Sequence, residues 1–206
     1  MKKKRIVIVI ALLVLVLVVA AYAAFFLIER GERRKMEREY PVAYTEEIQT
    51  CAAEYALDPY LVLAIMRCES SFKSDAVSSV GAIGLMQIMP DTGTWIAHKL
   101  GLDAVYNEQM LYDPACSVRF GCWFLRFLTD RFEGELPHII AAYNAGHGSV
   151  EKWLDDPAYS QNGILTAIPY PETERYVEKV QTALEAYRTL YPDLFTDGLI
   201  ESPDEA

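Results

Sequence analysis

One stretch restricts the possible folds of this chain more than any other: the 23 residues from Ile6 to Ile28 carry no charged side chain. A helix of this length spans about 34 Å at ~1.5 Å per residue, which exceeds the ~30 Å hydrocarbon core of a bilayer. The basic tip at residues 1–5 precedes it, and basic residues favour the cytoplasmic side of a membrane. The sequence therefore predicts a single-pass anchor in the cell membrane, with the rest of the chain on the extracytoplasmic side.

A cleaved signal peptide is the alternative interpretation of this stretch. Its apolar region would be ~7–15 residues long and would end at a small-x-small site. Residues 20–24 (Ala-Ala-Tyr-Ala-Ala) offer such a site, but the apolar run continues to Ile28. We therefore expect an uncleaved transmembrane helix.

The 178 residues that follow the anchor suit one domain with its own core. Residues 29–40 are dense in charges of both signs and are expected to form a stalk. Residues 41–195 form the predicted domain, and residues 196–206 form an acidic tail. Behind the anchor the chain holds 15 basic and 29 acidic residues, which argues against nucleic-acid binding because that function usually needs a basic face.

The cysteines and histidines do not form a recognised metal-binding pattern, because no Cys-x-x-Cys pair occurs and the histidines do not complete a zinc set. We expect neither a metal nor another cofactor. Outside the cytoplasm an even number of cysteines permits two disulfides in three pairings, whereas buried free thiols are common in protein cores. Both states stay open for Cys51, Cys68, Cys116 and Cys122.

Apolar residues recur at helical spacing through the domain, and no segment carries the alternation of a strand. Two Asp-Pro pairs, at residues 58–59 and 113–114, suit helix starts because Asp caps the first turn and Pro has the φ angle of the first helical position. The sequence therefore predicts an all-α domain. Further helices are expected behind caps at Thr45 and Asp91, over residues 136–144, through Trp153, and over residues 172–190.

Glu69 has unusual surroundings for a carboxyl group. It falls at the end of an apolar helical pattern, among Ile65, Met66 and Phe72. Loss of hydration favours the protonated form of a carboxyl group. A carboxyl group that is protonated near neutral pH is what a glycosidase needs to protonate a leaving oxygen.

Four sequence blocks together resemble a known family. Glu69-Ser-Ser-Phe72 is followed 15 residues later by Gly84-Leu-Met-Gln-Ile-Met-Pro90, and then by the blocks at residues 141–146 (Ala-Ala-Tyr-Asn-Ala-Gly) and 168–177 (Ile-Pro-Tyr-Pro-Glu-Thr-Glu-Arg-Tyr-Val). Their order and composition resemble the lytic transglycosylases of the soluble (SLT) type, which are relatives of the G-type lysozymes. The resemblance covers roughly residues 45–194.

The resemblance implies a lysozyme-like single domain that cleaves the β-1,4 bond between N-acetylmuramic acid and N-acetylglucosamine in peptidoglycan. It implies that Glu69 is the catalytic acid and base, and that the 6-hydroxyl of the muramic acid attacks its own anomeric carbon. The product is a 1,6-anhydro sugar, and no water is consumed. Substrate-binding roles are implied for Ser78, Gln87, Met89, Tyr143, Asn144, Tyr170 and Glu172.

Several of these residues also have ordinary structural interpretations. Ser78 suits a turn, Met89 suits the core, and a Tyr at the position of Tyr143 suits the core with its hydroxyl bonded. In the last block Glu174 stands where the family commonly has an Arg, and Arg175 comes one place later. Sugar stacking is possible for the three tryptophans, but core packing is the expected role of Trp95, Trp123 and Trp153.

Ordinary glycosidases use two carboxylates, and the sequence does not supply an obvious second one. The nearest acids, Asp58, Asp75 and Asp91, lie outside the four blocks. A hydrolytic muramidase, which would use a second carboxylate, therefore stays open as an alternative. Two further alternatives are an inactive glycan-binding scaffold and a lytic enzyme of the same chemistry that opens the wall for a secretion or conjugation machine.

Overall fold

The computed structural model describes residues 2–195, and it describes side chains from residue 12 onward, except that of residue 14. The chain divides into two units, Met1–Pro41 and a second unit that begins at Val42. The predicted acidic tail at residues 196–206 lies outside the described residues.

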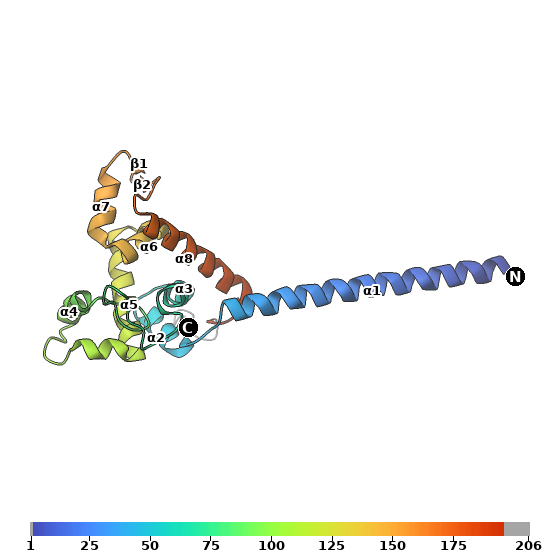
Figure 1. The fold of residues 1–206 in the computed structure, drawn as a ribbon, viewed down its shortest axis with the longest axis horizontal. Coiled ribbons are helices and arrows are strands. Elements are labelled where there is room, and N and C mark those ends of the chain that lie inside the picture. Colours follow the sequence, from blue (N-terminus) through green and yellow to red (C-terminus); the bar gives the residue numbers. More distant parts are fainter. Residues whose placement is uncertain (1, 196–206) are drawn as a thin grey trace, which may run out of the picture. The chain divides into compact units, whose positions relative to one another are not determined.

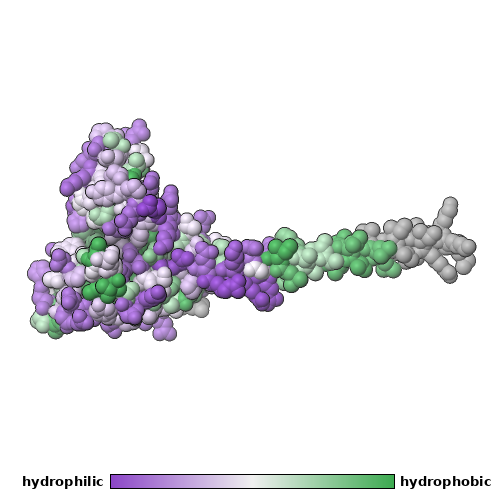
Figure 2. All heavy atoms as spheres, viewed as in Figure 1, coloured by the Kyte–Doolittle hydropathy of each residue, from purple (hydrophilic) through white to green (hydrophobic). Residues whose placement is uncertain are grey.

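The first unit consists of one helix, α1 (Lys2–Glu39) (Figure 1). Figure 2 shows an apolar length of this helix followed by a hydrophilic length, which corresponds to the predicted stalk. Within the hydrophilic length Arg33 Nε donates to Glu37 Oε1 at 3.0 Å. The described residues of α1 contain no segment that is long and apolar enough to cross a membrane, and the predicted span Ile6–Ile28 begins among side chains outside the described residues.

The second unit is mostly helical, as predicted. Figure 1 shows α7 and a small hairpin at one end of this unit and α2 and α4 at the opposite end. Its helices are α2 (Thr45–Glu54), α3 (Pro59–Ser70), α4 (Pro90–Lys99), the 3-10 helix η1 (Glu108–Tyr112), α5 (Pro114–Arg131), α6 (Leu136–Ala145), α7 (His147–Asp155) and α8 (Pro171–Leu190).

Both predicted Asp-Pro helix starts are confirmed. The Asp58 carboxylate accepts a hydrogen bond from the Tyr60 amide at 2.9 Å, and Asp113 accepts one from the Cys116 amide at 2.9 Å. Each bond satisfies one of the amides that lack a partner in a first helical turn. The start of α3 is thereby fixed, and with it the register that places Glu69 near its end.

Two other predicted caps are wrong. The residue before α2 is Tyr44, in the left-handed conformation at φ 56°, and the residue before α4 is Met89. Thr45 and Asp91 lie inside the first turns of these helices instead. Pro90 explains the second case, because proline suits the first helical position and moves the start one residue upstream of Asp91.

The expectation of no strands is also corrected in one place. Strands β1 (Ser160–Gln161) and β2 (Ile164–Leu165) form a two-stranded antiparallel hairpin. The Leu165 amide donates to Nε2 of His138 on α6 at 3.1 Å. Strands of two residues are too short to show the alternation on which sequence-based prediction of strands depends.

The core is built around α3, which packs against α8 and α2. Ile65 and Met66, the apolar neighbours of Glu69 on this helix, are buried, and so are Leu63 and Ala64, with 0% exposure each. Burial on more than one face makes α3 a central helix rather than a surface helix. Cys51, Cys68, Cys116 and Cys122 are free thiols, so the open question of disulfides is answered in favour of free cysteines in this structure.

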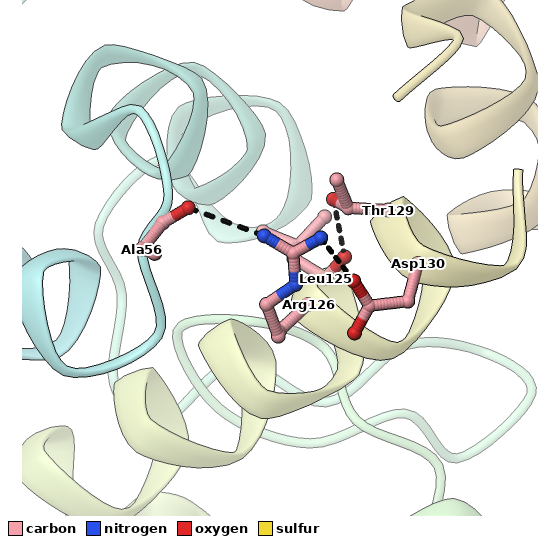
Figure 3. A network of polar contacts seen from close by, with 5 residues as sticks. All are labelled: Ala56, Leu125, Arg126, Thr129 and Asp130. Carbon is pink, nitrogen blue, oxygen red and sulfur yellow. Dashed lines mark hydrogen bonds and ion pairs between the residues drawn. The ribbon is translucent and has the colours of Figure 1, made fainter. Parts of the chain in front are cut away.

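Arg126 of α5 forms a hydrogen bond to the turn that leads into α3 (Figure 3). Its Nη1 donates to the Ala56 carbonyl at 3.3 Å, and its Nη2 pairs with Asp130. Ala56 has a φ of 49°, an uncommon value for a residue with a side chain. The guanidinium therefore stabilises a strained turn immediately before the helix that carries Glu69.

Candidate active site

An open cleft of about 550 Å³ lies where α3 ends, α6 ends and α8 begins. The loop between α3 and α4 forms its remaining wall. The cleft brings together all eight residues that the sequence singled out, whose individual roles stay predictions. Its lining consists of Glu69, Ser78, Val80, Ala82, Gln87, Met89, Tyr143, Asn144, Ala145, Tyr170, Pro171, Glu172 and Thr173.

Two sets of side chains at this cleft differ in burial. We call the lining residues Glu69 and Tyr143, together with Tyr176 behind Glu69, the floor, because burial is the largest influence on the pKa of each. We call Val80, Met89, Tyr170 and Glu172 the rim, because these lining residues are exposed, Val80 to 75% and Tyr170 to 52%.

Glu69 lies in the last turn of α3, one residue before the helix ends. Burial raises the pKa of its carboxyl group from 4.5 to about 7, while the Tyr176 hydroxyl and the charge of Lys179 act in the opposite direction. Both protonation states of Glu69 are therefore populated near neutral pH. The two residues after the helix, Ser71 and Phe72, have φ angles of 51° and 65°, so the chain turns sharply away behind the carboxyl group.

Tyr176 of α8 is the hydrogen-bond partner of the Glu69 carboxyl group. Its hydroxyl donates to Glu69 Oε1 at 2.5 Å. Tyr176 was not among the residues for which a catalytic or substrate-binding role was predicted. Its membership of the block at residues 168–177, which also supplies Tyr170 and Glu172, was the available signal for a part in the site.

Tyr143 was expected to form a hydrogen bond near the catalytic carboxyl group. Its hydroxyl donates to the Met86 carbonyl at 2.9 Å, and the centroid of its ring lies 5.5 Å from that of the Phe124 ring. Burial raises the pKa of Tyr143 well above its ordinary value, so the hydroxyl stays protonated. Tyr143 therefore connects α6 to the loop between α3 and α4.

The loop between α3 and α4 is held by its own polar groups. Ser78 Oγ accepts a hydrogen bond from the Ala82 amide at 2.9 Å, as expected of a turn residue that also faces a cleft. Gln87 has a φ of 47°, and its Nε2 donates to the carbonyls of Ala76 at 3.2 Å and Gly84 at 2.9 Å. These bonds fix the conformation of the loop, so its cleft-lining residues are pre-organised.

Gly84 allows this loop to approach η1 closely. Its φ is 76°, and a Cβ atom added there would lie 2.0 Å from the Leu111 carbonyl oxygen. Only glycine meets both conditions without displacement of the backbone.

The opposite wall comes from the end of α6, from Tyr170 and from the start of α8. Asn144 Oδ1 accepts a hydrogen bond from Thr173 Oγ1 at 2.8 Å, which joins the end of α6 to the start of α8. The rings of Tyr170 and Trp153 pack edge to face, with their centroids 5.0 Å apart. The other two tryptophans pack together, with Trp95 and Trp123 rings 5.1 Å apart, in agreement with the expected packing role.

Glu172 is the one candidate for a second carboxylate among the described lining residues. Among the described residues the cleft is lined by two carboxyl groups, those of Glu69 and Glu172. Of the acids nearest in sequence, Asp58 caps α3 and pairs with Arg188 at 2.5 Å, while Asp75 and Asp91 are not among the lining residues. The described residues also include no group of three or more His, Cys, Asp or Glu side chains that would hold a metal ion.

Comparison with known proteins relates this chain to one family. Residues 46–163 match the transglycosylase SLT domain. The soluble lytic murein transglycosylase of Escherichia coli (strain K12) is 32% identical over 154 residues, covering 74% of this chain and 24% of that protein. Membrane-bound lytic murein transglycosylase C of Actinobacillus pleuropneumoniae serotype 5b (strain L20) is 32% identical over 165 residues, covering 70% of this chain and 45% of that protein.

The solved structures similar to this chain belong to lytic transglycosylases as well. The 70-kDa soluble lytic transglycosylase of Escherichia coli superposes with a TM-score of 0.70 at 31% identity, over 78% of this chain and 26% of that one. Lytic transglycosylase Slt of Pseudomonas aeruginosa superposes with a TM-score of 0.68 at 33% identity, over 75% of this chain and 25% of that one. The chain thus spans about a quarter of the length of these two relatives. The match over residues 46–163, with the shared helical, lysozyme-like fold, shows that the chain belongs to the transglycosylase SLT family.

Proposed function

We propose that this protein is a membrane-anchored lytic transglycosylase that cleaves the β-1,4 bond between N-acetylmuramic acid and N-acetylglucosamine in peptidoglycan. The observation that carries the proposal is that Glu69 lines a cleft of about 550 Å³ and that burial raises its pKa to about 7. The efficiency of an acid–base catalyst is greatest when its pKa lies near the working pH. Family membership supplies the substrate class.

In the first step the protonated Glu69 carboxyl group donates its proton to the glycosidic oxygen. The bond from that oxygen to the anomeric carbon of the muramic acid breaks, and the N-acetylglucosamine leaves as an alcohol. Positive charge develops on the muramic acid ring, and the substrate's own acetamido group stabilises it. Glu69 is then a carboxylate, and the hydrogen bond from Tyr176 stabilises that form.

In the second step the 6-hydroxyl of the same muramic acid attacks its anomeric carbon, and Glu69 removes the hydroxyl proton. The product is a 1,6-anhydro sugar, and the enzyme returns to its protonated state. An intramolecular nucleophile has a high effective concentration, so an activated water molecule is not required. A single carboxyl group is therefore sufficient for the whole reaction.

A hydrolytic muramidase is the second candidate, and the presence of Glu172 in the cleft favours it. In that mechanism Glu172 would activate water on the other face of the sugar. Glu172 belongs to the rim and is exposed. The transglycosylase mechanism needs no role for it beyond contact with substrate.

Membrane anchoring belongs to the same proposal. The uncharged run at residues 6–28 and the continuity of α1 from Lys2 to Glu39 support a helical anchor that extends into a stalk. One relative is named a membrane-bound lytic transglycosylase. A tether of this kind would limit the enzyme's reach into the cell wall, and would suit an association with cell-wall or secretion machinery.

The test is mass spectrometry of the muropeptides that the full chain, in detergent micelles, releases from purified peptidoglycan. Anhydro-muramyl ends, which are lighter than reducing ends by one water, would support the proposal. Reducing ends would indicate hydrolysis and direct attention to Glu172. Retained binding without release would indicate a glycan-binding scaffold.

A further inference from the structure

A lysine lies beside the catalytic carboxyl group but makes its hydrogen bond elsewhere. Lys179 is on α8, one helical turn after Tyr176. Its ammonium group donates to the Cys68 carbonyl at 3.3 Å. This carbonyl is in the last turn of α3, and it belongs to the residue that precedes Glu69.

The position suits a cation for two separate reasons. Carbonyl groups in the last turn of a helix lack intrahelical partners and carry the negative end of the helix dipole, so a lysine there is stabilising. The same ammonium group also acts on the Glu69 carboxyl group, where it opposes the effect of burial. One side chain thus holds the end of α3 and places a positive charge near the reacting group.

The other titratable groups around Glu69 do not supply this charge. Tyr176 from α8 and Tyr143 from α6 are both neutral, because burial raises the pKa of each hydroxyl well above its ordinary value. The Cys68 thiol on α3 is also neutral, since burial raises its pKa. Glu172 in the cleft lining would only add negative charge.

We infer that Lys179 is a positioning residue of the catalytic site: its ammonium group binds the carbonyl next to Glu69 and stabilises the ionised carboxylate between the two proton transfers. The inference rests on the proposed function, in which Glu69 must be an acid first and a base afterwards. Burial alone would favour the acid form throughout. Lys179 balances the two forms without direct contact with substrate.

The test measures the protonation of Glu69 in the full chain by infrared difference spectroscopy, with Glu69→Gln as the reference that lacks the carboxyl band. Lys179→Met should raise the titration midpoint of Glu69 by about half a pH unit to one unit, a modest shift because the ammonium group is exposed. Lys179→Arg should return the midpoint to the wild-type value. High salt should move the wild-type midpoint in the same direction as Lys179→Met.

The same variants should alter the pH profile of kcat/KM. Activity is lost at high pH as Glu69 loses its proton, so the alkaline limb of Lys179→Met should lie at higher pH than that of the wild type. Lys152→Met, which removes an exposed lysine of α7, is the matched control and should leave the limb in place.

Two results would overturn the inference: an unchanged Glu69 midpoint in a folded Lys179→Met protein, or an equal shift in Lys152→Met. If Lys179→Met does not fold, the salt dependence of the wild-type midpoint decides the matter, and its absence overturns the inference. The infrared measurement does not depend on the product formed. A failure of the proposed function, seen as reducing ends, is therefore distinguishable from a failure of this inference.

Discussion

In the floor of the cleft the polar groups are buried and bonded to protein, whereas in the rim the side chains face solvent. Tyr176 bonds to Glu69 and Tyr143 bonds to the Met86 carbonyl, so the floor holds its groups in one arrangement. Val80 and Tyr170 in the rim are 75% and 52% exposed and have room to adapt. From this difference we expect the floor to carry out the proposed chemistry and the rim to bind the glycan strand.

Removal of the carboxyl group from the floor gives the sharpest test of this division. Glu69→Gln should lower kcat by about 10³-fold, because general acid–base catalysis typically contributes 10²–10⁴-fold. Peptidoglycan should still bind to the variant, since the rim is intact. Muropeptide release and a cell-wall pelleting assay would measure the two properties, and full activity in this variant would contradict the assignment of Glu69.

The same substitution should stabilise the protein at alkaline pH. The folded pKa of Glu69, about 7, exceeds the reference value of 4.5, so the stability that its protonated form contributes is full below pH 4.5 and is lost as the pH rises through 7. Because the cleft is open, we expect Glu69→Gln to exceed the wild type by about 1–2 kcal/mol at pH 8, with no difference at pH 4. Urea unfolding at the two pH values provides the measurement, and equal stability at pH 8 would contradict the burial of Glu69.

A smaller effect is expected for the partner of the carboxyl group. Tyr176→Phe removes the hydrogen bond that stabilises the carboxylate, so kcat should fall by about tenfold while KM changes little, and the Glu69 midpoint should rise. Tyr187→Phe, on the same helix and fully buried, serves as a comparison for general loss of a hydroxyl group. Equal losses in the two variants would mean that Tyr176 acts only through stability.

The smallest effect is expected in the rim. Tyr170→Ala should raise KM by about threefold to tenfold and leave kcat within about twofold of the wild type, because loss of contact area with substrate weakens uniform binding. Steady-state kinetics on soluble glycan strands would measure both constants. A fall in kcat without a change in KM would contradict the expectation that the rim contributes only to binding.

The sequence predicted those features that depend on local chemistry. The Asp58-Pro59 start of α3 is one example, because a cap and a proline act within a few residues. The gathering of the eight residues in one cleft was predicted through their resemblance to a family, not through spacing alone. The starts of α2 and α4 were missed because a backbone conformation at Tyr44 and the competing Pro90 decided them.

The electrostatics of the site were harder to predict. Tyr176 and Lys179 lie more than 100 residues from Glu69, and only the packing of α8 on α3 brings them near it. A helical pattern marks Tyr176 as inward-facing but does not say which polar group it meets. Likewise, the pKa of Glu69 depends on how completely the surrounding helices exclude water, which is a property of the assembled fold.

The close approach at Gly84 has a consequence for genetics. Any side chain at this position would press on the Leu111 carbonyl and would move the loop that carries Gln87 and Met89, without contact with Glu69. Because the fault would be one of packing, its severity should grow with temperature. Gly84→Ala is therefore a suitable starting point for a heat-sensitive allele, with which the proposed wall cleavage could be tested in living cells by a change of growth temperature.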